Sequence, residues 1–122
     1  MNWTVLGLMV VVVAIFLTLS KAGQISARDA AAYLKQGALV IDVRSAGEFT
    51  SGHLAQAINI PLDEIETALP KRVKDKSQVL LLHCASGMRS GMAKSKLNGM
   101  GYPNAFNLGG YSRAENILNQ QN

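Results

Sequence analysis

The chain has 122 residues, a net charge of +4 and 48% hydrophobic residues, and its length corresponds to about one domain. Residues 1–20 contain fifteen apolar side chains and no charged one. The other residues are about 43% apolar, which is ordinary for a globular domain and excludes a disordered chain. No second apolar run reaches bilayer length, which excludes a polytopic membrane protein. The single cysteine, Cys84, excludes an intramolecular disulfide.

The apolar N-terminal run predicts a membrane anchor. As a helix, residues 3–20 would extend about 27 Å, close to the hydrocarbon thickness of a bilayer. The sequence therefore predicts a transmembrane anchor over residues 1–22, with membrane lipid as its partner, and a separate domain over residues 23–122. Basic residues follow the run, so the positive-inside rule places this domain in the cytoplasm, with the periplasm as the alternative. A cleaved signal peptide is the competing interpretation, because Ser20-Lys21-Ala22 fits a small-x-small cleavage pattern.

Helices and strands are expected to alternate after this run. Ser26 is a predicted helix N-cap, and Ser45 with Glu48 forms a predicted capping box. Asp63 is predicted to begin a further helix, which Pro70 ends. The expected elements are a helix over 27–36, a strand over 39–43, a short helix over 45–52, a strand over 57–60, a helix over 63–70, a strand over 79–82, a helix over 90–100, a strand over 105–108 and a helix over 112–118.

This alternation predicts an α/β fold, in which a parallel sheet of short apolar strands is covered by helices on both faces. Ligands of such sheets bind beyond the carboxyl ends of the strands, so a site is expected in the loops after Val43, Leu82 and Leu108. The densest basic cluster, residues 71–76, has no interleaved aromatic residues, and no nucleic-acid partner is expected. One cysteine and two histidines supply a zinc site poorly, and neither a metal nor a cofactor is expected.

The loop after Leu82 carries the predicted chemistry, and it reads His83-Cys84-Ala85-Ser86-Gly87-Met88-Arg89-Ser90. Backbone N–H groups of such a loop and of the next helix can converge on one point. Gly87 permits a tight turn, and Arg89 adds a permanent positive charge. Each feature favours the thiolate of Cys84 over the thiol. We therefore interpret Cys84 as a nucleophile rather than as a small buried hydrophobic residue.

Three stretches resemble the signatures of rhodanese-type sulfurtransferases, and the resemblance extends over about residues 23–118. They are Cys-x-x-Gly-x-Arg-Ser over residues 84–90, Ile41-Asp42-Val43-Arg44-Ser45-x-x-Glu48-Phe49 continued by Gly52-His53-Leu54-x-x-Ala57-Ile58-Asn59-Ile60-Pro61, and Asn107-Leu108-x-Gly110. The resemblance implies a rhodanese-like α/β fold preceded here by the predicted transmembrane helix.

The same resemblance implies a sulfurtransferase that works through a persulfide on Cys84. The donor would be thiosulfate or a small persulfide, and the acceptor would be cyanide or a thiol, a protein thiol included. Arg89 would orient the anionic donor and help to hold the loop. Side chains or backbone of Ala85, Ser86, Gly87 and Met88 would bind the substrate and shape the entrance.

Two other activities compete with sulfur transfer. Cysteine phosphatases and arsenate reductases of related fold carry five residues between the cysteine and the arginine, whereas four separate Cys84 from Arg89 here. The shorter loop is suited to a sulfur atom rather than a tetrahedral phosphate. The second alternative is a non-catalytic rhodanese-like module that recruits a partner, or carries a persulfide, at the membrane.

Several polar residues near the expected site have a structural interpretation beside a chemical one. Asp42 is expected to organise the adjacent loops by accepting backbone N–H bonds rather than to act as a base. Arg44 could meet the anionic donor, although pairing with Glu48 is favoured. His53 is expected to fix its loop. His83 could tune the thiolate, but a packed histidine with satisfied hydrogen bonds is favoured.

Overall fold

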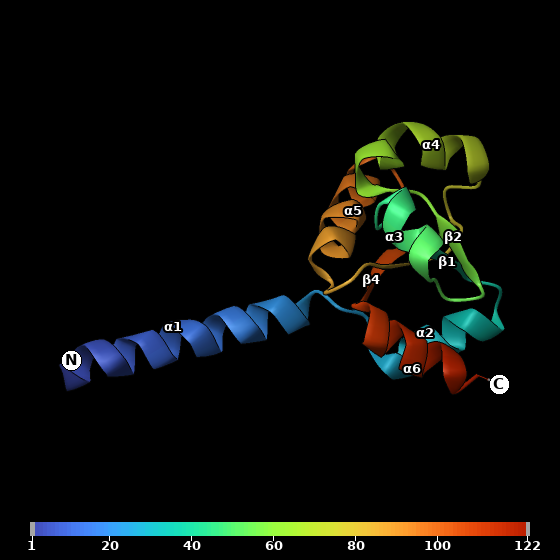
Figure 1. Ribbon diagram of the computed structural model, residues 1–122. Coiled ribbons are helices and arrows are strands. Elements are labelled where there is room, and N and C mark those ends of the chain that lie inside the picture. Colours follow the sequence, from blue (N-terminus) through green and yellow to red (C-terminus); the bar gives the residue numbers. More distant parts are fainter. Residues whose placement is uncertain (1, 122) are drawn as a thin grey trace.

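The computed structural model describes residues 2–121, except for the side chains of residues 17–22. Helices and strands alternate along the described residues, as Figure 1 shows. In chain order the elements are α1 (Trp3–Ala22), α2 (Ala27–Lys35), β1 (Leu39–Asp42), α3 (Ala46–Ser51), β2 (Ala57–Asn59), the 3₁₀ helix η1 (Leu62–Glu64), α4 (Ile65–Arg72), β3 (Leu80–His83), α5 (Met88–Gly99), β4 (Ala105–Gly109) and α6 (Tyr111–Asn119).

The four strands form one parallel sheet in the order β2-β1-β3-β4. In its register, Ile41 of β1 lies between Ile58 of β2 and Leu82 of β3. All carboxyl ends therefore meet at one edge of the sheet, where the loops after β1, β3 and β4 come together. The predicted α/β fold with a parallel sheet is confirmed.

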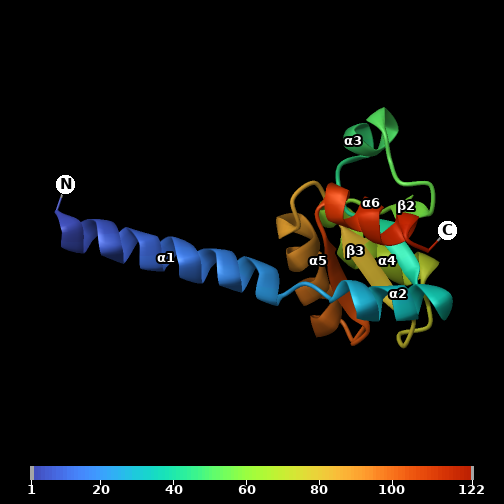
Figure 2. The same cartoon turned by 90° about the horizontal axis from the view of Figure 1, so that it is seen from below.

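Helices cover both faces of this sheet (Figures 1 and 2). Because side chains alternate along a strand, Leu80 and Leu82 face one way and Leu81 the other. The first two pack in a core with α4 and α5, and the third packs in a core with α2 and α6. All three leucines are fully buried, and each such burial stabilises the fold by about 1.5–3 kcal/mol.

The predicted helix starts at Ser26 and Ser45 are confirmed. Ser26 Oγ accepts the Asp29 N–H at 3.1 Å and thereby caps α2. At α3 the Ser45 side chain accepts the Glu48 N–H, and the Glu48 carboxylate accepts the Ser45 N–H in return. This capping box fixes the direction in which Glu48 leaves the helix.

Three other helix boundaries differ from the prediction. Asp63 lies within η1, whose first turn has no side-chain cap, and α4 continues past Pro70 to Arg72. The proline removes one helical hydrogen bond, but the Val73 N–H still reaches the Leu69 carbonyl at 2.8 Å. Helix α5 begins at Met88 rather than at residue 90, because Gly87 supplies the turn into the helix.

The predicted membrane anchor is wrong. No helix in the described part of the chain has both the length and the apolar character needed to cross a membrane. The expected contact with lipid and the placement of the domain on one side of a membrane both depended on this anchor, so they are no longer supported. The side chains of Ser20-Lys21-Ala22, on which the cleavage alternative rests, lie outside the described ones.

Candidate active site

Cys84 lies directly after β3 at the carboxyl edge of the sheet, where the loop turns into α5. Its Sγ atom accepts the Gly87 N–H at 3.0 Å. The turn requires a left-handed backbone at Gly87, whose φ is +96°, and a Cβ there would lie 3.1 Å from Gln24 Nε2. The glycine thus lets the loop curl until its own N–H points at the sulfur.

The surroundings of Cys84 favour its thiolate. The side chain is fully buried, and burial alone would raise the pKa of the thiol. Hydrogen bonding from Ser90 and from the N–H groups of Gly87 and Ser86 outweighs burial and lowers the pKa. The predicted convergence of loop amides on the sulfur is therefore present.

Arg89 follows in the first turn of α5, but its guanidinium binds Glu48 of α3. The two nitrogen–oxygen distances are 2.7 and 3.0 Å, a bidentate pair between side chains that are about a third exposed. This contact, with the Ser45 N–H, lowers the pKa of Glu48 to about 2. Hydrogen bonding to Glu48 also raises the pKa of Arg89, and the charge of Cys84 contributes to that rise. The contact joins α3 to the cysteine loop.

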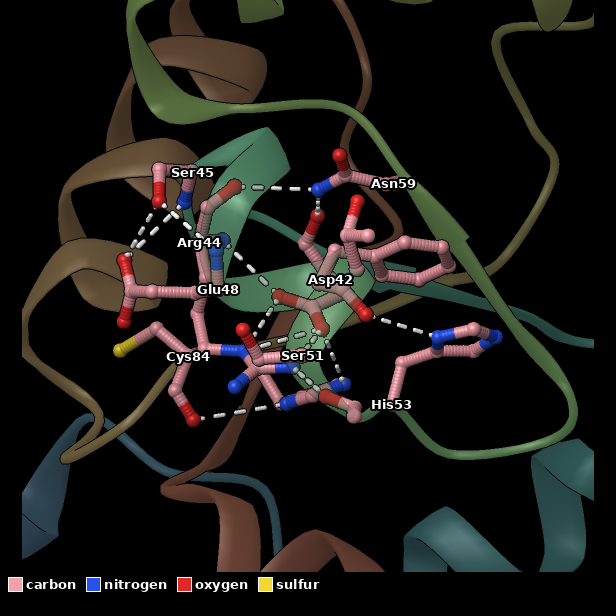
Figure 3. A network of polar contacts seen from close by, with 12 residues as sticks. Asp42, Arg44, Ser45, Glu48, Ser51, His53, Asn59 and Cys84 are labelled. Carbon is pink, nitrogen blue, oxygen red and sulfur yellow. Dashed lines mark hydrogen bonds and ion pairs between the residues drawn. The ribbon is translucent and has the colours of Figure 1, made fainter.

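Arg44 does not pair with Glu48, so that prediction is wrong. Its guanidinium instead binds the buried Asp42 carboxylate in three contacts of 2.8–3.1 Å and the Gly52 carbonyl at 2.7 Å. It also lies 4.9 Å from the ring centre of Tyr111. Figure 3 shows Arg44 beside Asp42, with Glu48 of α3 nearby. Glu48 is free to reach α5 because Asp42, only two residues from Arg44, is the closer and more deeply buried acceptor.

Asp42 organises the start of the loop after β1, as predicted. Its Oδ1 accepts the Arg44 N–H at 2.9 Å. Asn59 secures the same turn from β2, because its Nδ2 donates to the carbonyls of Asp42 and Arg44, both at 3.0 Å (Figure 3). The bonds from the Arg44 N–H and guanidinium explain how the buried Asp42 carboxylate is accommodated at the edge of the sheet.

His83 is packed, but its hydrogen bonds are not all satisfied, which corrects the favoured interpretation. The residue is fully buried, and its Nε2 has no hydrogen-bond partner among the described residues. Burial lowers the pKa of His83, although the Asp42 carboxylate, 3.8 Å away, and the Cys84 carbonyl oppose that effect. The ring is therefore neutral near pH 7, and its contact with Asp42 is not an ion pair.

His53 fixes its loop, as expected. Its Nδ1 bonds the Phe49 carbonyl at 2.8 Å, and its ring stacks on the Phe49 ring with centres 3.7 Å apart. His53 lies in the turn that follows α3 and packs back against the last part of that helix.

The remaining loop residues lie against the turn between β4 and α6. The Ala85 carbonyl accepts the Tyr111 N–H at 3.2 Å, and Ser86 forms an isolated β-bridge with Gly110. Met88 is 68% exposed, so it lies at the rim of the site and not under it. The site is thus assembled from the three loops that the sequence singled out.

Sequence reasoning missed three contacts of this site, which two residues make. Glu48 meets Arg89 across 41 positions, and Asn107 of β4 bonds Ser90 and Gly87. Glu48 and Asn107 were both part of the family-like stretches, which was the available signal. No local pattern shows which distant side chain each would meet.

Comparison with known proteins identifies this arrangement. The family model of the rhodanese-like domain matches residues 26–116. The chain belongs to the rhodanese-like family. The rhodanese-like domain is 40% identical over 70 residues to thiosulfate sulfurtransferase PspE of Escherichia coli K12, a match that covers 57% of this chain and 67% of that protein.

Solved structures support the same fold. An E. coli rhodanese with anions aligns with a TM-score of 0.58 and 38% identity, over 61% of this chain and 87% of that one. The human single-domain sulfurtransferase TSTD1 aligns with a TM-score of 0.64 and 25% identity, over 77% and 96%. A tRNA uridine(34) hydroxylase of Erwinia tasmaniensis is 30% identical, but this chain spans only 28% of its length.

Proposed function

We propose that residues 23–122 form a sulfurtransferase that carries sulfur on Cys84. The Cys84 thiolate attacks the outer sulfur of thiosulfate, a new S–S bond forms, and sulfite leaves with the electron pair of the broken bond. A thiolate or cyanide then attacks the terminal sulfur of the persulfide, and the Cys84 thiolate is the leaving group. The 122 residues contain no second thiol, so the acceptor in this scheme is an external one.

The observation that carries the proposal is the contact between the Gly87 N–H and Cys84 Sγ at 3.0 Å, within a loop that lowers the pKa of the thiol. The same N–H groups can stabilise the anionic persulfide, since they already point at the sulfur. Four residues between Cys84 and Arg89 form a smaller cradle than the five of the related phosphatases. This length supports sulfur over phosphate as the group transferred.

Arg89 is the residue to which we assign orientation of the anionic donor. Its side chain is 36% exposed, so a small anion from solvent can reach it although Glu48 binds both terminal nitrogens. Ala85, Ser86 and Gly87 supply the backbone of the cradle, and Met88 borders its entrance. Contact between Arg44 and the donor stays a prediction, because that guanidinium is bound to Asp42 and Gly52.

Release of thiocyanate from thiosulfate and cyanide tests the proposal. Cys84→Ser is expected to reduce the rate to that of the uncatalysed reaction, because a hydroxyl cannot carry the sulfur as a persulfide. Ser51→Ala is the control, since Ser51 Oγ bonds only an exposed helical carbonyl among the described residues. Undiminished thiocyanate release by Cys84→Ser would contradict the mechanism. A wild-type chain that releases none from thiosulfate or from a persulfide donor would favour the non-catalytic module.

A further inference from the structure

Asn107 in β4 contacts three positions around Cys84 through one side-chain amide. Its Nδ2 donates to the Gly87 carbonyl at 3.0 Å. Its Oδ1 accepts the Gly109 N–H at 2.9 Å and lies 2.7 Å from Ser90 Oγ. The residue is only 5% exposed, so these bonds are not shared with bulk water. The reaction scheme above gives this amide no task.

The orientation of the Asn107 amide is fixed by its backbone partners. The Gly109 N–H can only donate, so the atom that faces it is the amide oxygen. The Gly87 carbonyl can only accept, so the atom that faces it is the amide nitrogen. Exchanging the two atoms would lose both bonds, and the atom opposite Ser90 is therefore the oxygen.

Ser90 has one hydroxyl hydrogen and three acceptors that compete for it, of which the Gly109 carbonyl lies 3.5 Å from Ser90 Oγ. Ser90 Oγ lies 2.7 Å from Asn107 Oδ1 and 3.5 Å from Cys84 Sγ. The amide oxygen carries no hydrogen, so two oxygens at 2.7 Å would repel each other unless the serine hydrogen lay between them. The Ser90 hydroxyl is thus directed at Asn107 and turns an oxygen lone pair toward the sulfur.

We propose that Asn107 is a positioning residue that keeps the Ser90 hydroxyl hydrogen away from Cys84, so that backbone N–H groups alone hold the thiolate. The inference rests on the proposed function, for which the reactivity of the sulfur matters. A thiolate that accepts fewer hydrogen bonds is the more basic one, and nucleophilicity rises with basicity. In this arrangement the loop amides keep the sulfur ionised. Asn107 prevents a further hydrogen bond from Ser90, which would make the thiolate a weaker nucleophile.

Titration of the Cys84 thiol in four chains tests this inference: the wild type, Ser90→Ala, Asn107→Leu and the double variant. The pKa is measured from the pH dependence of alkylation by iodoacetamide, which requires no sulfur donor. Ser90→Ala is expected to change the pKa by less than about 0.3, whereas loss of a hydroxyl bond to the thiolate would raise it by about 1–2.

Asn107→Leu is expected to release the hydroxyl to the sulfur and to lower the thiol pKa by about 1. The alkylation rate of the fully ionised thiol should then fall about threefold, because nucleophilicity follows basicity with a slope of about 0.4–0.5. Adding Ser90→Ala should restore both values, which a merely structural role of Asn107 would not do. Asn104→Leu, at the opposite end of β4, is the control and should leave both unchanged.

A rise of about 1 or more in the thiol pKa of Ser90→Ala would overturn the inference, because Ser90 would then already donate to Cys84. This variant keeps the Asn107 side chain and decides the question even if Asn107→Leu fails to fold. An Asn107→Leu chain that folds and titrates as the wild type would also overturn it. The proposed sulfur transfer is unaffected by either result, since it is measured separately by thiocyanate release.

Discussion

His83 is a buried neutral ring beside the nucleophile, and its own titration has a consequence for stability. Because its pKa is lowered in the fold, the unfolded chain binds more protons at mildly acidic pH. The stability that this group contributes is present above its unfolded pKa of about 6.5 and is lost as the pH falls below that value.

We expect the free energy of unfolding to fall by up to about 1 kcal/mol between about pH 7.5 and about pH 5.5, and His83→Gln to remove most of that fall. Urea unfolding at the two pH values measures it. His53→Gln is the matched control, because that ring is exposed and bonds only the Phe49 carbonyl among the described residues. An equal fall in wild type and His83→Gln would show that the buried ring is not the group responsible.

At the scale of single residues, the sequence predicted the hydrogen bonds around Cys84 better than the partners of its neighbours. The glycine and arginine after Cys84 lie within five positions of it, so their effects could be read locally. Arg44, by contrast, has acidic residues on both sides, and only the buried position of Asp42 decides between that carboxylate and Glu48. Which carboxylate Arg44 binds depends on how α3 packs against the loop, and the spacing of residues along the sequence does not show this.

Helix α3 is tied to the cysteine loop by the bond between Glu48 and Arg89, and this bond can be followed by titration. The Glu48 carboxylate is expected to titrate in NMR spectra with a midpoint at about 2, below its ordinary value of 4.5. The stabilisation from this contact is therefore present above about 4.5 and is lost as the pH falls toward about 2.

Arg89→Gln should raise the Glu48 midpoint toward its ordinary value, because hydrogen bonding to Arg89 is the largest cause of the lowering. Lys96→Gln is the control, since Lys96 pairs with Glu66 and not with Glu48. A Glu48 midpoint that is the same with and without Arg89 would show that the two helices are not joined in solution as they are here.

The turn between β4 and α6 packs directly against the cysteine loop. At Gly110 the two segments are so close that there is no room for a side chain. A Cβ at Gly110 would lie 2.8 Å from the Ala85 carbonyl oxygen and 3.2 Å from Ser86 Cα. The φ of Gly110 is −78°, so the obstacle is this contact and not backbone strain.

Gly110→Ala should therefore displace the loop and lower kcat/KM for sulfur transfer by roughly ten- to a hundredfold. Gly47→Ala, in α3, is the matched control, because a Cβ there meets nothing within 4 Å. Melting curves of both variants would show whether each chain is folded. Wild-type activity in a folded Gly110→Ala chain would contradict the role given to this turn.

Local sequence signals predicted the helices and strands, but they did not predict contacts between residues that are far apart in the sequence. Ser26 and Ser45 mark helix starts by their own hydrogen bonds, so those boundaries were predictable. Pro70 was expected to end a helix, but packing of Leu69 in the core holds the chain helical beyond it. The bond from Asn107 to Ser90 crosses 17 positions and depends on how β4 lies beside β3.

The molecule as a whole draws its two cores from the rhodanese-like domain. Neither core contains a described side chain from before Ile25. Helix α1 extends away from the sheet in Figures 1 and 2. Deletion of residues 2–22 is therefore expected to change Tm by less than about 4 °C, the equivalent of less than about 1 kcal/mol.

Thermal unfolding of the shortened and full chains by circular dichroism checks this expectation. Leu81→Ala in the full chain is the comparison, because truncation of a fully buried leucine costs about 2–5 kcal/mol. A loss of Tm on deletion as large as that of Leu81→Ala would mean that residues 2–22 take part in the fold of the domain.

The most direct test of the account is the intact mass of the chain after incubation with thiosulfate and removal of the excess donor. We predict a gain of one sulfur atom, located on Cys84 by peptide mapping and lost again on addition of cyanide. Cys84→Ser should gain nothing under the same conditions. A wild-type chain whose Cys84 is alkylated by iodoacetamide, but which gains no sulfur from thiosulfate or from a small persulfide, would contradict the proposal that Cys84 carries sulfur.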